Sequence, residues 1–436
     1  MRILILLAQY YPMVNPNVYR WSAVAEQWVA EGHEVHVLCT RRKGVTDEAE
    51  IKGVQVHRAG QATLLDWTYN LLGTQQRRAE VGANKAQKSS FFRQILEWIV
   101  DRTWRKFYWP DGSCLWYLPG KKRALELQKQ FHFDAMVSVS LPFTANLIAG
   151  ALKKQFPKVK WLMDIEDPFA FSDEFWVNNF QLYRGKNFRA EARALELADV
   201  VSVTVHAAKR KYIQYFPDLN LEEKISVTPP LANEIQNTEN QQIGAFIENK
   251  IHLAYFGTFY EQVRMPDAFL QLLRQLFTQY PDFQDQLHVH FFGEIPPKAQ
   301  AVFDQFVDLK ENLRFHGLVS RKTVAVAIQQ TDFLLNIGNT TNYHLPSKSA
   351  EYLMSGKPII NICQHPEDTF QEFIQDYPII CNLPVFQQDM LPDLVNQLAI
   401  FIQQNHNRRV PQATIQQLSQ PYTTAAVADA YLKMLL

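Results

Sequence analysis

The first forty residues alternate between short apolar runs and a helical pattern, and this alternation restricts the fold more than any other feature. Residues 3–8 are an apolar run with the length of a strand that is buried on both faces. The next stretch carries apolar residues at the spacing of one helix face: Trp21, Val24, Ala25, Trp28 and Val29. Gly32 ends that helix, and residues 35–38 predict a second strand. A strand, a helix and a strand in this order predict a parallel sheet of the Rossmann type.

The same alternation returns in the second half of the chain. Residues 251–256 predict a strand, and residues 266–280 predict the helix that follows it. Further strands are predicted at residues 287–292, 313–319 and 332–337, and further helices at residues 390–404 and 422–436. Between the two halves, residues 231–249 are rich in Asn, Gln and Glu, which is typical of a linker. We therefore expect two α/β domains.

Composition and charge exclude several classes of protein. A length of 436 residues indicates two or three domains. Lys plus Arg and Asp plus Glu number 44 each, so no nucleic-acid partner is indicated. The four cysteines lack metal-ligand spacing, which favours buried thiols in a reducing compartment. Because the sequence shows no signal peptide and no apolar run of about 20 residues, we expect a cytoplasmic protein, with peripheral contact to the inner face of the cytoplasmic membrane left open.

Residues 339–362 carry the strongest chemical signal. A polar loop leads to a short helix, which Gly356 ends, and a buried strand then follows. Lys348, predicted in the first helical turn, opposes the helix dipole, an arrangement that makes sense if an anion is bound at that helix start. Glu351 shares a face with Lys348 and can accept hydrogen bonds from a diol such as a ribose. An anion beside a diol indicates a nucleotide sugar. The alternative is a helix that Ser347 caps, with a solvated Lys–Glu pair.

Residues 346–358 read Pro-Ser-Lys-x-x-Glu-Tyr-x-x-x-Gly-Lys-Pro. This pattern resembles the donor-site motif of retaining GT-B glycosyltransferases of family 4. The resemblance implies an α/β protein with the GT-B fold, in which two Rossmann-like domains face each other across a cleft. It also implies that Glu351 binds the nucleotide ribose. Tyr343 stands where the family usually has a second glutamate, which leaves the sugar and the detailed reaction open.

The resemblance also divides the chain into functional parts. It implies an N-terminal acceptor domain at residues 1–230, a linker at 231–249, a C-terminal nucleotide-sugar domain at 250–418, and a last helix within 419–436 that crosses back to the first domain.

Residues 67–123 match nothing in the family. They combine five tryptophans with other aromatic and many basic side chains, a mixture that suits the surface of an anionic membrane, where a lipid-linked acceptor would lie. The alternative is a helical insertion whose aromatic residues pack into the domain and whose basic residues are solvated, since Glu97 and Asp101 lie in the same stretch.

Residues near several strand ends fit the donor side. Gly257 follows a strand and lets the backbone approach a phosphate, while Arg264 can pair with a diphosphate. Thr258 replaces an arginine of the family, and the alternative for Arg264 is an ordinary surface position. The donor-binding candidates are Gly257, Thr258, Arg264, Gly293, His344, Leu345, Ser347, Lys348 and Glu351. Of these, Arg264 and Lys348 are also catalytic candidates, because cations stabilise the charge that grows on the leaving phosphate.

Two predicted strands of the first half, at residues 134–140 and 161–165, end in polar residues, where open α/β sheets bind ligands. The run Asp164-Ile-Glu166-Asp167-Pro168-Phe169 resembles the Asp-x-Arg-Asp-Pro-Trp element of bacterial envelope glycosyltransferases, with Glu166 in place of the arginine. Asp167 is the catalytic candidate that orients or deprotonates the acceptor hydroxyl, and the alternative is that it caps a turn. The acceptor-side candidates are Asn15, Asn17, Arg20, Asp164 and Asp167.

The implied function is a retaining glycosyltransferase that moves a sugar from a nucleotide-diphosphate sugar to a glycan or lipid-linked acceptor. The resemblance favours bacterial envelope polysaccharides, such as capsule or lipopolysaccharide. The sequence has no Asp-x-Asp motif, so we expect neither a metal nor another cofactor. The resemblance also implies that the leaving phosphate takes the acceptor proton and that no protein nucleophile takes part. The alternatives are a nucleotide-sugar epimerase of the same fold and an inactive nucleotide-sugar-binding partner.

Overall fold

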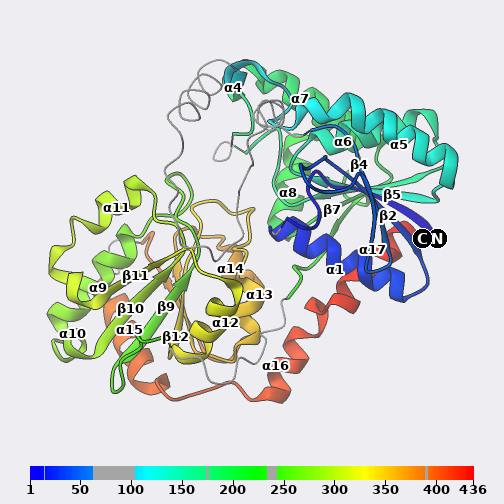
Figure 1. The fold of residues 1–436 in the computed structure, drawn as a ribbon. Coiled ribbons are helices and arrows are strands. Elements are labelled where there is room, and N and C mark those ends of the chain that lie inside the picture. Colours follow the sequence, from blue (N-terminus) through cyan, green and yellow to red (C-terminus); the bar gives the residue numbers. More distant parts are fainter. Residues whose placement is uncertain (14, 62–103, 173–175, 233–242, 388–390) are drawn as a thin grey trace. The chain divides into compact units, whose positions relative to one another are not determined.

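The computed structural model describes the chain except residues 14, 62–103, 173–175, 233–242 and 388–390 (Figure 1). The described residues form two compact units. The first unit contains the described parts of residues 1–78 and 84–230 together with residues 424–436, and the second unit contains those of residues 231–423. Each unit is built around one sheet.

The first unit contains a sheet of eight strands in the order β3-β4-β2-β1-β5-β6-β7-β8. The strands are β1 (Arg2–Leu6), β2 (Glu34–Cys39), β3 (Glu48–Ile51), β4 (Val54–Arg58), β5 (Ala135–Ser140), β6 (Lys160–Ile165), β7 (Val200–Val203) and β8 (Ile225–Val227). All neighbours pair in parallel except β3 and β4. The inner strands β1, β2 and β5 are buried along nearly their whole length, which explains their largely apolar sequence.

The helices of the first unit follow the strands in the expected alternation. They are α1 (Pro16–Ala30), α4 (Trp104–Phe107), α5 (Tyr117–Phe131), α6 (Thr144–Gln155), α7 (Phe180–Leu197), α8 (His206–Tyr215) and α17 (Thr424–Leu435). Helix α1 begins where the side chain of Asn15 accepts a hydrogen bond from the backbone N of Val18 over 2.9 Å, an N-cap contact.

The last helix, α17, belongs to the first unit and packs against α1 (Figure 1). Trp28 Nε1 donates to the carbonyl oxygen of Ala428 over 3.0 Å, and the ring centroids of Trp21 and Tyr431 lie 4.7 Å apart. The carboxylate of Asp164, on β6, accepts one hydrogen bond from Trp21 Nε1 over 3.0 Å and another from the Tyr431 hydroxyl over 2.8 Å. Asp164 therefore joins β6, α1 and α17 inside the core.

The second unit contains a sheet of six parallel strands in the order β11-β10-β9-β12-β13-β14. The strands are β9 (Ile251–Phe256), β10 (Leu287–Phe292), β11 (Leu313–Gly317), β12 (Phe333–Ile337), β13 (Ile359–Cys363) and β14 (Ile380–Pro384). The helices are α9 (Asp267–Gln279), α10 (Asp282–Gln286), α11 (Pro297–Phe303), α12 (Arg321–Gln330), α13 (Ser349–Met354), α14 (Thr369–Phe373), α15 (Leu391–Asn405) and α16 (Gln412–Ser419). The strands predicted at residues 251–256 and 287–292 are confirmed with these bounds.

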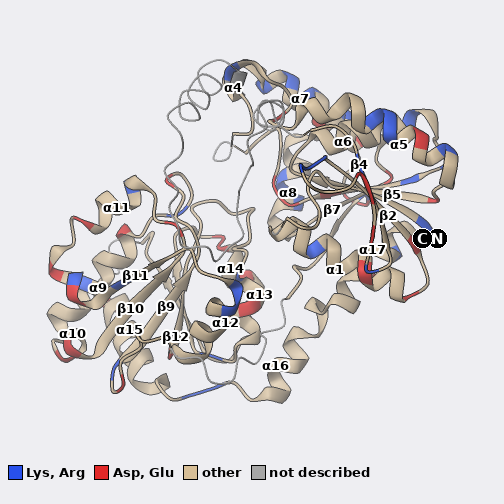
Figure 2. Cartoon of the chain, viewed as in Figure 1, with Lys and Arg blue, Asp and Glu red and all other residues tan. Residues whose placement is uncertain are grey.

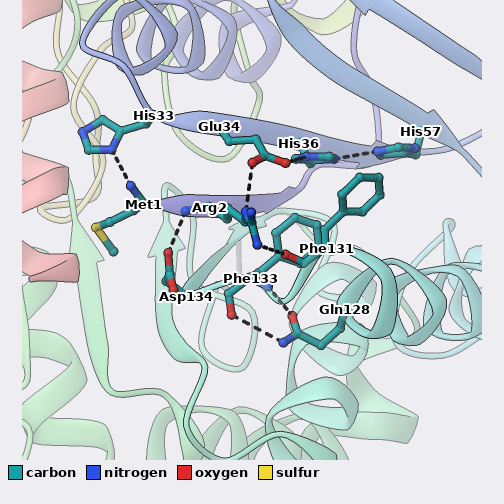
Figure 3. Close-up of polar contacts among 10 residues, drawn as sticks. All are labelled: Met1, Arg2, His33, Glu34, His36, His57, Gln128, Phe131, Phe133 and Asp134. Atoms are coloured by element: carbon teal, nitrogen blue, oxygen red, sulfur yellow. Dashed lines mark hydrogen bonds and ion pairs between the residues drawn. The ribbon is translucent and has the colours of Figure 1, made fainter.

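Figure 3 shows a polar chain across one edge of the first sheet. Nδ1 of His36, on β2, lies 2.9 Å from Nε2 of His57, on β4. Glu34 lies 3.1 Å from the other ring nitrogen of His36 and accepts from Arg2 Nε over 2.9 Å. Glu48, on β3, contacts the other ring nitrogen of His57. Side chains from four neighbouring strands are thus linked across the sheet.

A second chain of histidines crosses the second sheet. His252 Nδ1 lies 2.9 Å from His290 Nε2, and His290 Nδ1 lies 3.0 Å from His316 Nε2. His252 Nε2 lies 2.9 Å from the carbonyl oxygen of Ile247. Three neutral imidazoles supply one N–H for each of these three contacts. Burial lowers the pKa of His290 to about 2 and also lowers the pKa of His316.

We expect the free energy of unfolding of the second unit to fall as the pH is lowered below about 6.5. The unfolded chain takes up protons near the ordinary histidine pKa, whereas native His290 stays neutral, so acid favours unfolding. His290 alone accounts for a loss of about 2 kcal/mol at pH 5. Denaturant unfolding at pH 7 and pH 5 measures the loss, which His290→Phe should reduce. An equal loss in the variant would contradict the role of His290.

Candidate functional site

Most donor-side candidates lie at the carboxyl ends of β9, β10 and β12, the edge at which open α/β sheets bind ligands. Gly257 directly follows β9 and Gly293 directly follows β10. Gly293 has a φ of +142°, and a Cβ atom there would lie 2.1 Å from the carbonyl oxygen of Gly257. Only glycine permits this approach, so the two strand ends form a closely packed, side-chain-free stretch of backbone.

The segment after Gly257 forms a turn. The backbone N of Arg264 donates to the carbonyl oxygen of Tyr260 over 2.8 Å, and α9 begins only at Asp267. The helix predicted at residues 266–280 is α9, and this turn lies between it and the glycine. Thr258, which follows the glycine, is half-buried.

The guanidinium of Arg264 is held at this edge by two neighbours. Its Nε and Nη2 both donate to Asn339 Oδ1, over 3.0 and 2.6 Å, and its Nη1 donates to the Tyr255 hydroxyl over 3.2 Å. These contacts use three of the five N–H groups of a guanidinium, which leaves two for a ligand. Asn339 is a residue that the sequence reasoning missed. Its only sequence signal is its position just after β12.

The loop from β12 to α13 is fixed through the backbone of His344. The carbonyl oxygen of His344 accepts from Asn339 Nδ2 over 3.0 Å and from Thr369 Oγ1 over 2.6 Å, and its ring Nδ1 lies 3.2 Å from Thr341 Oγ1. Leu345 is half-buried and Ser347 is exposed. Asn339 thus contacts both Arg264 and the loop that leads to Lys348.

Lys348 and Glu351 form an ion pair at the start of α13. Lys348 Nζ lies 3.0 Å from Glu351 Oε1, as the helical spacing predicts, and the side chains are 29% and 7% exposed. Lys348 occupies the N-cap position instead of the first helical turn, with no side-chain capping bond. Capping by Ser347, the alternative considered above, is therefore wrong. The buried carboxylate of Glu351 also does not fit a merely solvated surface pair.

The acceptor-side candidates lie in the first unit, and the structure gives them different surroundings. Asn15 caps α1. Arg20 is buried and donates to the Tyr431 hydroxyl and, over 3.3 Å, to the carbonyl oxygen of Pro229. Asp164 is 1% exposed, and its two oxygens accept from Trp21 and Tyr431. Arg20 and Asp164 thus hold α1 and α17 together. The sequence pattern did not indicate this structural role.

Glu166 and Asp167 directly follow β6 and are both half-buried. The side-chain amide of Asn17 faces the carboxylate of Glu166, and in the orientation that satisfies both groups its nitrogen donates to Oε1 over 2.7 Å. Burial raises the pKa of Glu166 to about 8, Arg20 acts to lower it, and the carboxylates of Asp164 and Asp167 raise it further. In the sequence, Glu166 could be described only as the residue that stands in place of an arginine. Its surroundings come from distant segments, which the local pattern does not indicate.

Glu191, on α7, fixes the backbone just after Asp167. Its carboxylate accepts from the backbone N of Phe169 over 3.3 Å, from that of Ala170 over 2.7 Å, and from the Tyr212 hydroxyl over 2.8 Å. Burial raises the pKa of Glu191 to about 7. The sequence offers no signal for this contact, which joins residues more than twenty positions apart.

Most of the aromatic and basic stretch, residues 67–103, lies outside the described residues, so its predicted membrane contact stays a prediction. In the described remainder, residues 104–123, Trp116 is buried, and basic segments lie on α5, which begins at Tyr117 (Figure 2). Within the described chain, no helix is long and apolar enough to cross a bilayer. The described residues also contain no cluster of three or more His, Cys, Asp or Glu arranged to hold a metal.

Two α/β units with these parallel sheets define the GT-B fold, and solved GT-B glycosyltransferases share it. The chain is similar to sucrose-phosphate synthase from Thermosynechococcus elongatus, with 12% identity and a TM-score of 0.62 over 99% of this chain and 98% of that chain. It is similar to HepE from Anabaena, solved in complex with UDP and glucose, with 12% identity and a TM-score of 0.60 over 100% and 99%. It is also similar to WaaG, a glycosyltransferase involved in lipopolysaccharide biosynthesis, with 13% identity and a TM-score of 0.55 over 99% of both chains. No protein-family model matches the sequence, and neither does any curated protein.

Proposed function

We propose that this protein is a retaining glycosyltransferase that transfers a sugar from a nucleotide-diphosphate sugar to a glycan or lipid-linked acceptor. The observation that carries the proposal is the grouping at the carboxyl edge of the second sheet. There, the Gly257–Gly293 backbone, the oriented guanidinium of Arg264 and the Lys348–Glu351 pair lie on the loops that follow β9, β10 and β12. The fold that the chain shares with HepE, which was solved with UDP and glucose, supports this reading.

The donor side has groups suited to the bond that must break. As the sugar leaves the diphosphate, negative charge grows on the phosphate, and fixed cations lower that barrier. Arg264 has two N–H groups left for phosphate oxygens, and Lys348 adds an ammonium. Glu351 would accept hydrogen bonds from the ribose hydroxyls. With these cations in place the reaction requires no metal, and metal independence is part of the proposal.

The first unit would present the acceptor at the end of β6, beside Asp167. The resemblance of the Asp164–Phe169 run to envelope glycosyltransferases, together with the fold shared with WaaG, favours an envelope polysaccharide acceptor. That assignment is an analogy of fold and motif.

A thermal-shift screen without added metal tests the donor site first. The screen uses UDP, GDP, ADP, CMP and their common sugar conjugates. A nucleotide at 100 times its dissociation constant should stabilise the protein by about 2.7 kcal/mol, which raises Tm by several degrees. Chelator-treated protein should respond equally if the donor site is independent of metal. A shift that appears only with added metal would overturn metal independence, and no shift with any nucleotide would overturn the proposed donor site.

For Asp167→Asn we expect slower transfer with donor binding retained. The substitution removes a carboxylate that orients the acceptor hydroxyl but leaves the donor-side residues of the second unit in place. Turnover and nucleotide affinity are measured on the same preparation. If nucleotide affinity falls instead, the assignment of the acceptor to the first unit is wrong.

A further inference from the structure

Among the described residues, all hydrogen-bond partners of the Arg264 guanidinium are neutral groups. Its Nε and Nη2 donate to Asn339 Oδ1 over 3.0 and 2.6 Å, and its Nη1 donates to the Tyr255 hydroxyl over 3.2 Å. Arg264 is half-buried, and a charge that is partly removed from water is ordinarily paired with an opposite charge. An amide oxygen and a hydroxyl instead hold the guanidinium without offsetting its charge. The positive charge is therefore kept for an anionic ligand.

A second, independent observation places this guanidinium beside the end of β9. A Cβ atom on Gly257 would lie 2.8 Å from the Tyr255 hydroxyl oxygen and 3.3 Å from Arg264 Nη1. Any side chain at Gly257 would thus displace the hydroxyl or the guanidinium. Because Tyr255 is 1% exposed, its ring is fixed by the core and its hydroxyl has little freedom to move. The cation therefore lies next to the Gly257–Gly293 backbone, where the diphosphate is proposed to bind.

The side-chain amide of Asn339 has one orientation that satisfies its contacts. Its Oδ1 accepts from Arg264, and its Nδ2 donates to the carbonyl oxygen of His344 over 3.0 Å. A guanidinium can only donate and a carbonyl can only accept, so the amide cannot be turned around. Asn339 is 5% exposed. An aspartate at this position would place a negative charge beside Arg264 and would lose the donor to His344.

We propose that Asn339 is a positioning residue of the donor site, which holds the guanidinium of Arg264 in place for the diphosphate, leaves its charge intact and joins it to the loop that leads to Lys348. The inference rests on the proposed function and adds to it the group that orients the cation. Asn339 acts through Arg264. A side chain that is already held in its binding conformation loses less freedom when the ligand binds, and a fixed cation stabilises the leaving phosphate without rearranging.

A purely structural Asn339 would only fasten the loop between β12 and α13. The two roles differ in how the effect of Asn339 depends on Arg264. A positioning residue loses its effect on the ligand once Arg264 has been removed, because it acts through that side chain. A structural residue weakens binding by the same factor whether Arg264 is present or not.

The test is a double-mutant cycle on the dissociation constant of the nucleoside diphosphate that stabilises the protein most in the screen. Calorimetric titration compares the wild-type protein, Asn339→Ala, Arg264→Ala and the double variant. We expect Arg264→Ala to weaken binding at least tenfold and Asn339→Ala to weaken it about fivefold. In the Arg264→Ala background, Asn339→Ala should change the dissociation constant by less than about twofold. A fivefold loss in both backgrounds would overturn the positioning role.

Asn339→Asp tests whether the partner of Arg264 must be neutral. The substitution keeps the size of the side chain and an oxygen that accepts from Arg264, so it also serves if Asn339→Ala is too unstable to titrate. We expect the nucleoside diphosphate to bind at least tenfold more weakly, because the carboxylate offsets the charge of the guanidinium. Wild-type affinity in this variant would contradict the inference.

Asn312→Ala is the matched control for a loss of stability. Asn312 is 3% exposed, and its Nδ2 donates to the carbonyl oxygens of Gln284 and Leu287 over 2.6 and 2.8 Å, at the amino end of β10. This variant should have a lower Tm without ligand and the wild-type dissociation constant. A loss of affinity as large as that of Asn339→Ala would show that reduced stability alone weakens binding, and would overturn the inference.

Failure of the inference can be told apart from failure of the proposed function. If the wild-type protein binds the nucleotide and both Asn339 variants bind it equally well, the positioning role is wrong and the proposed function stands. If Arg264→Ala binds as the wild-type protein does, Arg264 does not contact the diphosphate, and Asn339 has nothing to position there. If the wild-type protein binds no nucleotide, both proposals are wrong.

Discussion

Lys348→Ala should lower the turnover of the donor nucleotide sugar at least tenfold. In the proposed site the ammonium of Lys348 stabilises the charge that grows on the leaving phosphate. A hydrogen bond to a charged group contributes about 1.5–3 kcal/mol, which corresponds to roughly a ten- to hundredfold change in rate. Steady-state release of nucleoside diphosphate measures the effect. Because the interaction strengthens as the bond breaks, the loss should appear in kcat as well as in kcat/KM.

The same substitution removes the ammonium beside the buried carboxylate of Glu351, so stability must be measured separately. Thermal unfolding without ligand shows whether Lys348→Ala still folds. Lys433→Ala is a suitable control, because it also removes a lysine that belongs to an ion pair. Lys433 Nζ lies 2.7 Å from Asp429 on the exposed surface of α17. Its turnover should be unchanged. Wild-type turnover in Lys348→Ala would exclude Lys348 from the diphosphate site.

Asp164→Ala should destabilise the first unit by about 3–5 kcal/mol, because removing one partner of a buried charged network leaves the other charge uncompensated. Asp164 is the point where β6, α1 and α17 meet, and its loss leaves Trp21 Nε1 and the Tyr431 hydroxyl without their acceptor. Arg20, which donates to Tyr431, then keeps a buried positive charge. Denaturant unfolding followed by tryptophan fluorescence measures the loss.

Two variants sharpen this prediction. Asp164→Asn retains an acceptor oxygen and should be less destabilised than Asp164→Ala. Asp429→Ala removes an exposed carboxylate of α17 and should change stability by less than about 1 kcal/mol. A loss of the same small size for Asp164→Ala would show that the network with Tyr431 does not hold α17. In that case the buried position of Asp164 would need another explanation, and its placement on the acceptor side would regain support.

Local sequence patterns determined the elements of this fold. The largely apolar runs at residues 251–256 and 287–292 became β9 and β10 without a change of bounds, because a strand buried on both faces favours apolar side chains on both of them. Lys348 and Glu351 lie 3.0 Å apart because residues three positions apart share one face of a helix. Two α/β domains could be predicted because two successive series of strands and helices leave few alternatives, and the resemblance of residues 346–358 to a donor-site motif implied the GT-B arrangement.

Contacts between distant segments could not be predicted from any sequence pattern. Arg20 and Asp164 were predicted near the acceptor, yet they meet Tyr431, which lies 267 positions after Asp164. Arg264 follows β9, whereas its partner Asn339 follows β12. The raised pKa of Glu166 depends on burial, which no local pattern indicates.

The sequence by itself thus determined the order of strands and helices, the glycines at the strand ends and the local pair of Lys348 and Glu351. These features depend on backbone preferences and on spacings within one element, which neighbouring residues set. Only the tertiary structure decided which charges are buried, which side chains meet across the sheet and which carboxyl group keeps its proton. Those properties depend on desolvation and on the distance between charges, and both exist only once segments far apart in the chain have packed together.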